Sequence, residues 1–161
     1  CFDPRCYPWR KLMQALEQIT SGGKSLEDIE GEMLEYPQVE CQITHRFGPD
    51  IYIREGLIPA GTLIMGHAHR TEHMNVVLKG RIAVVMDGEV QILEGPTSFT
   101  APAGRKVIYA IDEAIMQNVH VTSETDVDAL EDQLVDKSDT WTAHEIETST
   151  GVLLSAIEGP A

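Results

Sequence analysis

At residue 39 the hydrophobic pattern of the chain changes from a helical period to a period of two. Along VECQITHRF, residues 39–47, larger side chains alternate with polar ones. Similar short β-rich runs continue to residue 122 and are separated by turn signals such as GPD, PAG and APAG. The dipeptide Asp87-Gly88, between two apolar runs, predicts a tight hairpin. Many short strands at a spacing of roughly 10 residues predict an antiparallel sandwich or barrel.

The segments on either side of this β-rich region have helical patterns. Residues 8–19 begin with Pro8, which suits a first helical turn, and carry apolar side chains on one face. A second short helix is predicted at residues 25–34, with Ser25 as its N-cap. We therefore expect three sections, which are a helical arm at 1–36, a β-barrel at 37–122, and a C-terminal helix with a tail at 123–161.

The C-terminal helix is predicted from TSETDVDALEDQLVD, residues 122–136. This segment begins with capping residues and places Val127, Leu130, Leu134 and Val135 on one stripe. The tail that follows is weakly patterned. Because the arm and the tail are long relative to the barrel, we expect them to embrace a neighbouring subunit, which predicts a homo-oligomer.

The composition excludes several classes of function. Twelve basic residues stand against 26 acidic ones, which gives a formal charge of −14. Such a field repels nucleic-acid phosphates and anionic lipids, so neither nucleic acid nor a membrane is an expected partner. No apolar run approaches the ~18 residues of a membrane span. The cysteines, Cys1, Cys6 and Cys41, form no CxxC pair, so neither a disulfide framework nor a thiolate zinc site is predicted.

Three histidines lie close together in GHAHRTEHMNVV, residues 66–77. Residues 69–73, HRTEH, match H-x-x-E-H, in which two helical histidines bind zinc and a glutamate acts as a base. A turn-forming Pro59-Ala60-Gly61 precedes this stretch, and the β-branched run MNVVLKGRIAVVM follows it. Both oppose a helix, so we expect the histidines to lie on strands.

On a strand, His67 and His69 point to the same side, since residues i and i+2 share a face. That face also carries Leu63 and Met65, and we expect it to be the interior of the barrel. A bend would then bring His73, at the start of the next strand, close to the first pair. Neutral imidazoles suit zinc, copper, nickel or ferrous iron, so the cluster predicts a metal site.

The spacing of these residues resembles the first motif of the cupin superfamily, G-x5-H-x-H-x3,4-E-x6-G. The chain has Gly61-x5-His67-x-His69-x3-His73-x6-Gly80, in which His73 takes the place of the glutamate. The usual set of three histidines and one glutamate therefore does not carry over whole.

The second cupin motif, G-x5,6-P-x-G-x2-H-x3-N, is matched in part. Gly95, Pro102 and Gly104 are present, but Val107 and Ile111 occupy the histidine and asparagine positions. The resemblance covers roughly residues 57–122. It implies a mainly β fold, the cupin-like double-stranded β-helix or jelly-roll barrel, with a metal held inside.

The stretches HRTEHMNVVLKG, APAG and NVHVT, followed by the acidic SETDVDALEDQL, are also similar to small cupin-like proteins encoded by tailed phages and prophages. That resemblance implies His69, His73 and His120 as the core ligands of a divalent metal ion, iron, nickel, manganese or zinc. It makes His67 an additional ligand or a neighbour of the ligands. Glu72 is a metal ligand, an acceptor that orients an imidazole, or a turn residue, and we favour the last two roles.

Further pocket residues are predicted with weaker signals. His45 falls on the apolar face of its strand, and Asn75 and Tyr109 are placed to line a pocket.

Two classes of function remain open. An enzyme would use one metal ion with open positions, suited to dioxygenation, isomerisation or metal-assisted hydrolysis of a small molecule. A non-catalytic protein would use the barrel as a scaffold, in a virion, in assembly or in binding a phage or host protein. The expected location is the cytoplasm, of the host if the protein is phage encoded, with the virion as the alternative.

Overall fold

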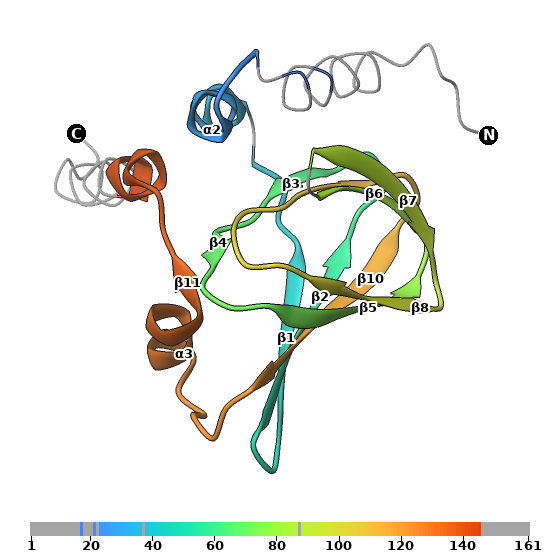
Figure 1. Cartoon of the computed structure of the whole chain (residues 1–161), viewed down its shortest axis with the longest axis vertical. Coiled ribbons are helices and arrows are strands. Elements are labelled where there is room, and N and C mark those ends of the chain that lie inside the picture. The colour runs from blue at the N-terminus through green and yellow to red at the C-terminus, as the bar shows by residue number, and fades with distance from the viewer. Residues whose placement is uncertain (1–16, 18–20, 22, 37, 87, 146–161) are drawn as a thin grey trace, which may run out of the picture.

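Two antiparallel β-sheets face each other and form the body of the protein (Figure 1). The computed structural model describes residues 17, 21, 23–36, 38–86 and 88–145. The helix predicted at 8–19 lies almost wholly outside the described residues, and so does the tail from residue 146. No helix in the described part of the chain combines the length and the apolar character that a membrane crossing requires.

Nine strands form the two main sheets. The first sheet has the order β1 (Gln42–Gly48), β2 (Ile51–Ile58), β10 (Ala114–Val121), β5 (His73–Lys79), β8 (Thr97–Ala101). The second has the order β3 (Leu63–Met65), β9 (Val107–Ala110), β6 (Arg81–Met86), β7 (Glu89–Glu94). A separate two-stranded ladder pairs β4 (Ala68–His69) with β11 (Val135–Asp136).

The connectivity of these strands is that of a jelly roll. The chain passes from one sheet to the other between β2 and β3, from β3 to β5 by way of β4, and then between β5 and β6, β7 and β8, β8 and β9, and β9 and β10. Within each sheet most neighbouring strands are therefore distant in sequence, as in a double-stranded β-helix. Strand β1 adds a fifth strand to the first sheet through its hairpin with β2. The predicted fold class is confirmed.

Local turn chemistry agrees with this topology. Strands β6 and β7 pair as far as Met86 and Glu89, as the predicted hairpin requires, and Gly88 between them has a positive φ of 78°. At the turn from β5 to β6, Gly80 has a φ of 83°, and a Cβ there would collide with the carbonyl oxygen of Glu113. Glycine is thus required at this turn for both its conformation and its small size.

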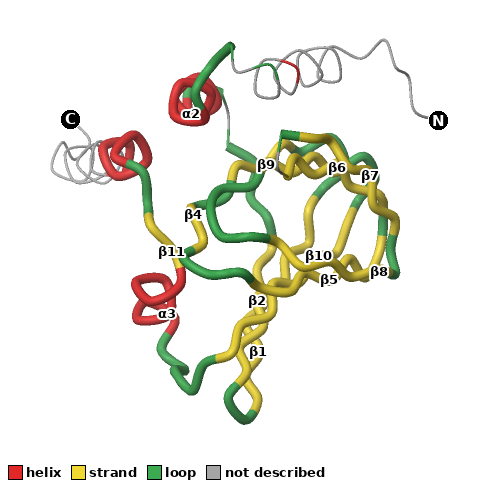
Figure 2. The backbone as a smooth tube through the Cα atoms, in the orientation of Figure 1, coloured by secondary structure: helices red, strands yellow, loops and turns green. Residues whose placement is uncertain are grey.

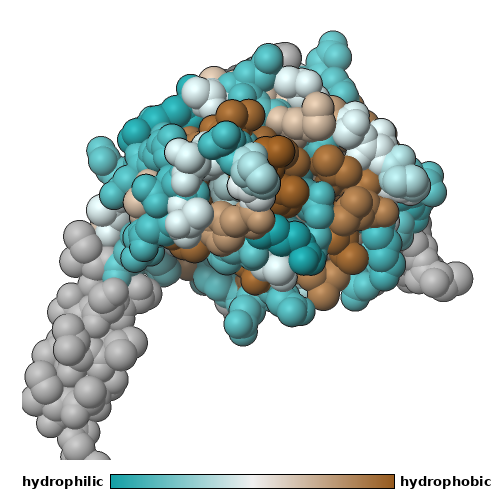
Figure 3. All heavy atoms as spheres, turned by 90° about the horizontal axis from the view of Figure 1, so that it is seen from below, coloured by the Kyte–Doolittle hydropathy of each residue, from teal (hydrophilic) through white to brown (hydrophobic). Residues whose placement is uncertain are grey.

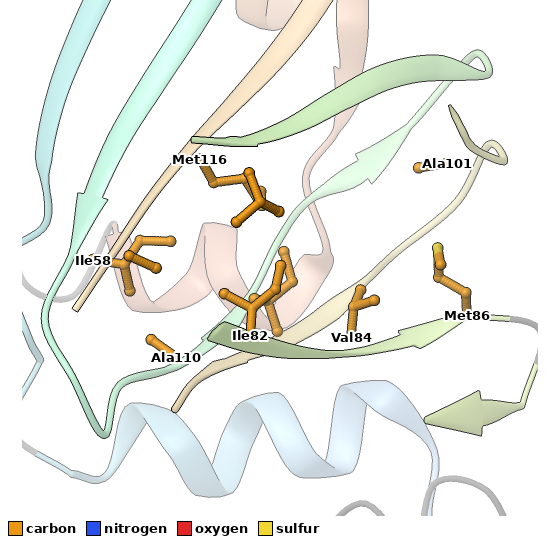
Figure 4. Packing of buried hydrophobic residues seen from close by; sticks show 10 residues of the cluster. Ile58, Ile82, Val84, Met86, Ala101, Ala110 and Met116 are labelled. Atoms are coloured by element: carbon orange, nitrogen blue, oxygen red, sulfur yellow. The ribbon is translucent and has the colours of Figure 1, made fainter. Parts of the chain in front are cut away.

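The apolar core lies between the two sheets, whose strands the backbone trace shows in yellow (Figure 2). Figure 4 shows Ile82 and Val84 of β6 pointing toward Met116 of β10. The buried members of this interior cluster are Ile58, Val77, Ile82, Val84, Met86, Ala101, Ile108, Ala110, Ala114 and Met116.

A second apolar cluster lies on the outer face of the second sheet, where Leu26 of helix α2 (Leu26–Leu34) packs against it. Leu63 and Met65 pack against this cluster, whereas Ile64 packs against the interior one. The prediction that they mark the interior face is therefore wrong for Leu63, whereas Met65 both packs against the outer cluster and lines the cavity. The chain leaves regular strand geometry between Met65 and Ala68, so a period of two cannot be extended from β3 into β4.

The helices begin where capping chemistry predicts. Ser25 is the N-cap of α2, and its hydroxyl accepts from the Asp28 amide at 3.1 Å. Helix α3 (Val127–Leu134) begins at the cap Asp126, but Val135, expected on its apolar stripe, starts β11 instead. Residues 139–145 begin a further helix that the weak pattern of the tail did not predict.

A buried ion pair joins segments that are far apart in the sequence. Arg105 donates to both carboxylate oxygens of Glu30 on α2, and the side chains of the two residues are 11% and 5% exposed. The Nε of Arg105 also donates to the carbonyl of Gly66 at 3.0 Å, and the hydroxyl of Ser138 donates to Glu30 at 2.5 Å. Burial raises the pKa of Glu30, but the hydrogen bonds from Arg105 and Ser138 outweigh it and hold that pKa below its usual range.

Replacing Glu30 by Gln should destabilise the fold strongly. The guanidinium of Arg105 would remain buried without a counter-charge, and removal of one partner of a buried ion pair costs about 3–5 kcal/mol. Urea denaturation of the metal-free protein near neutral pH measures this loss. The matched control is Glu113→Gln, which breaks the exposed ion pair with Lys79 and should cost about 0.5 kcal/mol or less. Equal losses in the two variants would contradict the role given to this network.

Candidate metal centre

Three of the predicted histidines come together from three different strands. His69 ends β4, His73 begins β5, and His120 lies near the end of β10. The backbone of His69 is fixed by reciprocal hydrogen bonds with Gly104, at 3.1 and 2.8 Å. His120 shares the interior face of β10 with Asn118, as expected from the period of two.

The side chains of His73 and His120 are buried, that of His69 is half-buried, and the three rings lie close to one another. A nitrogen from each of them lies within 4.8 Å of those of the other two. The ring centroids are 4.0 Å apart for His69 and His73, 4.8 Å for His73 and His120, and 5.4 Å for His69 and His120. Metal–nitrogen bonds of about 2.1 Å require nitrogen separations of about 3.0–3.4 Å, so modest ring rotations would complete a site.

Burial keeps these imidazoles neutral. It lowers the pKa of His69 to about 3 and that of His120 to about 4, with repulsion from neighbouring positive charges adding to the effect. Burial also lowers the pKa of His73. The neutral imidazole is the form that binds metal ions, so the cluster is ready for binding at neutral pH.

The donor set fits a divalent metal. The Nδ1 of His69 is buried and has no hydrogen-bond partner among the described residues, which is unusual for a polar atom. The Nδ1 of His73 lies 3.2 Å from the carbonyl oxygen of Thr71, a contact that would leave its Nε2 for a ligand role. Three imidazoles suit zinc, iron or nickel better than manganese, which prefers oxygen donors.

The other two residues of the histidine-rich stretch lie apart from this cluster. His67 contacts the ring of Trp141 edge-on, with centroids 5.3 Å apart, and lines the adjoining cavity. Glu72 is exposed in the bend before β5 and is not part of the potential metal-binding group. The geometry therefore supports a turn role for Glu72 and not direct binding.

Of the three residues predicted with weaker signals to line a pocket, two face the cavity and one faces outward. Asn75 is buried and accepts a hydrogen bond from Asn118 across the sheet, and both line the cavity. His45 lines it too, with its Nδ1 2.7 Å from the hydroxyl of Tyr52. The prediction for Tyr109 is wrong, because its side chain packs in the outer cluster while the neighbouring Ile108 faces inward.

A cavity of about 400 Å³ extends from the three histidines into the barrel. Sequence reasoning missed Arg54 and Lys106 among its lining residues, although the run IYIREGLI carried a signal for Arg54. One face of β2 carries every second residue, namely Tyr52, Arg54, Gly56 and Ile58. Strand alternation therefore predicts that the charged Arg54 lies on the same inner face as the buried members of this set. Residues of α3 and β11 and Trp141 complete the wall.

Similar solved structures include cupin superfamily proteins. A conserved protein from Streptococcus pyogenes is 20% identical over 55% of this chain and 80% of that one, with a TM-score of 0.45. KdgF from Halomonas sp. is 18% identical over 55% and 87%, with a TM-score of 0.46. A cupin superfamily protein from Desulfitobacterium hafniense is 12% identical over 58% and 87%, also with a TM-score of 0.46. No protein-family model and no curated protein matches the chain.

The metal-free protein should lose stability as the pH falls from about 7 to about 5. An unfolded histidine titrates near 6.5, whereas His69 and His120 have pKa values of about 3 and about 4 when folded. In that range the unfolded chain binds more protons, so acidification favours unfolding. Urea denaturation in the presence of a chelator measures the slope, which should be shallower in the double variant His69→Gln, His120→Gln.

The internal control is the range above about pH 7.5, where histidines are neutral in both states and the two slopes should coincide. Identical slopes of the two proteins in the acidic range would show that the cluster does not hold its rings neutral.

Proposed function

We propose that this chain is a small cupin-like metal-binding protein in which His69, His73 and His120 hold a divalent ion. The observation that carries this proposal is that two buried imidazoles and one half-buried imidazole, the latter with a buried and unsatisfied nitrogen, bring their nitrogens within 4.8 Å of one another. A buried imidazole nitrogen without a hydrogen-bond partner costs free energy, and a bound ion would compensate for it.

The surroundings of the cluster favour a site that takes a ligand over a purely structural one. Structural zinc sites are closed by four protein ligands, whereas three leave at least one position open. Here the described residues supply three, and the cavity reaches them. When bound, a divalent ion held by neutral imidazoles keeps its full charge and supplies Lewis-acid chemistry.

The finer parts of the proposal rest on resemblance. Cupin membership comes from the motif spacing, an origin in a phage or prophage comes from the similarity of the histidine-rich and acidic stretches, and a place in the cytoplasm is proposed along with them. Dioxygenation, isomerisation and hydrolysis all remain compatible with the site.

The proposal is tested by elemental analysis of protein purified without an affinity tag or added metal. Wild type should carry near-stoichiometric iron, nickel or zinc, and the double variant His69→Ala, His73→Ala should lose it because only one imidazole of the cluster remains. Circular dichroism should show that the variant stays folded. The matched control His67→Ala, two residues from the cluster's His69, should retain the metal. Retention in the double variant would contradict the site.

A second candidate function, assembly through a sheet face, is favoured by a separate observation. The outer face of the first sheet carries apolar side chains on three adjacent strands, and Met74, Leu78 and Val121 on it are 50%, 43% and 87% exposed. Seen from below the view of Figure 1, the surface shows apolar patches among polar side chains (Figure 3). By strand alternation this face comprises Ile51, Ile53, Leu57, Met74, Val76, Leu78, Ile115, Val119 and Val121.

A second copy of the chain is the partner that fits this face. Monomers rarely expose contiguous apolar patches beyond a few hundred Å², and a stable dimer buries about 800 Å² per partner. The charged groups on the face are already satisfied within it, because Glu55 accepts from Arg46 at 2.9 Å and from Gln117 at 2.6 Å. The excess negative charge of the chain therefore opposes docking here less than elsewhere.

Light scattering with size-exclusion chromatography tests this assembly. Wild type should have about twice the monomer mass of 17.8 kDa, and Met74→Glu with Val121→Glu should shift it to the monomer. Ile92→Glu, at an exposed apolar position of the other sheet, is the control and should leave the mass unchanged. A monomeric wild type would rule out this dimer.

A further inference from the structure

On the inner face of the first sheet, residues paired across neighbouring strands form rows, and the chemical character of these rows changes with distance from the histidine cluster. In the first row, Tyr52 of β2 is paired with His120 of β10. The next row is polar, and crosses the sheet through His45, Arg54, Asn118 and Asn75. The third is apolar, with Ile43, Gly56 and Met116. All of these residues line the cavity, so a ligand there would meet the imidazoles, then polar groups, then an apolar end.

Arg54 is the distinctive residue of the polar row. Its guanidinium makes no hydrogen bond or ion pair among the described residues, whereas Arg46 and Arg105 each bind a carboxylate. The neighbouring side-chain amides hydrogen-bond to each other, with Asn118 donating to Asn75. Arg54 is exposed and lines the cavity, so its guanidinium is accessible to a ligand there and is suited to bind a planar anion through two parallel hydrogen bonds.

The charges around the cavity favour an anion, although the chain as a whole carries −14. Arg54 and Lys106 both line it, and the ammonium of Lys106 is held in place by the carbonyls of Pro102 and Gly104. The acidic group in the lining, Glu131, lies 3.3 Å from the ammonium of Lys137, which also lies 3.5 Å from Glu145. A positive cavity in a negative protein attracts small anions locally.

The far end of the cavity requires an apolar group. Ile58, Ile108 and Met116 line it, together with Cys41, Ile64 and Phe99. Gly56 leaves room there, because it lies on the inner face of β2 between Arg54 and Ile58. The volume of about 400 Å³ is within the range of small-molecule sites.

We propose that this cavity binds a small organic acid, with its carboxylate on Arg54 beside the histidine cluster and its apolar body against Met116 and Ile58. The inference rests on the proposed function in one respect, since it places the carboxylate end next to the metal. A carboxylate carries one negative charge, which one guanidinium compensates, whereas a phosphate dianion carries one charge more than Arg54 compensates.

Isothermal titration calorimetry with hexanoate and phenylacetate tests the proposal, with hexanamide and phenylacetamide as neutral counterparts. Metal-free and zinc-loaded protein are both titrated. The acids should bind at least about tenfold more tightly than the amides, because a hydrogen-bonded charge pair is lost with the amide. Arg54→Gln should remove this preference, and Arg54→Lys should keep part of it.

The matched control is Arg46→Gln, which removes the same charge from the neighbouring strand but from the outer face of the sheet. It should bind the acids as wild type does. Equal affinity for acid and amide, no binding of either acid, or an unchanged preference in Arg54→Gln would overturn the proposal. Tighter binding of hexyl phosphate than of hexanoate would overturn it in favour of a phosphate ester.

The two proposals fail separately. Acid binding to metal-free protein that depends on Arg54 would support the inference even if no metal is retained. Stoichiometric metal that is lost in the histidine variant, without any acid binding, would support the metal site and overturn the inference alone.

Discussion

The buried ion pair between Arg105 and Glu30 is the contact on which the arrangement around the site depends. Its two charges satisfy each other and also bind the Gly66 carbonyl and the Ser138 hydroxyl. Four segments distant in sequence are thereby held at one point of the second sheet. Gly66 precedes β4, which carries His69, so the ion pair limits where that imidazole can lie. A buried pair with all its hydrogen bonds made specifies one arrangement even where its net contribution to stability is small.

The histidine cluster illustrates the opposite use of burial. No carboxylate belongs to the group of potential ligands among the described residues. Burial therefore keeps the imidazoles uncharged, whereas the charges of Arg105 and Glu30 are paired. The cost is the unsatisfied Nδ1 of His69. Each of the three histidines lies on a paired strand, so the ladders hold the three backbones near one another. The fold thus keeps donor atoms together that would lower their free energy by binding a cation, which is the physical basis of a preorganised site.

Much of this arrangement could be predicted from the sequence, because it depends on local rules. Strand alternation and turn residues predicted the sandwich, and the serine cap predicted the start of α2 at Leu26. Spacing and resemblance brought His69, His73 and His120 together. The predictions failed where regular structure is interrupted. The break after Met65 shifted the inferred face of β3, and Tyr109 was assigned to the wrong side of β9 for lack of a register.

Arg54 and Trp141 show a different limit, since their roles depend on what lies opposite. Arg54 is exposed, as a charged residue in a strand usually is; alternation along β2 gives its side of the sheet, but its place beside a cavity depends on the pairing with Asn118. Trp141 reaches the cavity because β11 pairs with β4. In this ladder Val135 pairs with His69, which is 66 positions away in the sequence. The same ladder attaches the C-terminal segment directly to a proposed metal ligand. Ligand access and the position of His69 are therefore coupled, because one wall of the cavity and one imidazole share a two-stranded ladder.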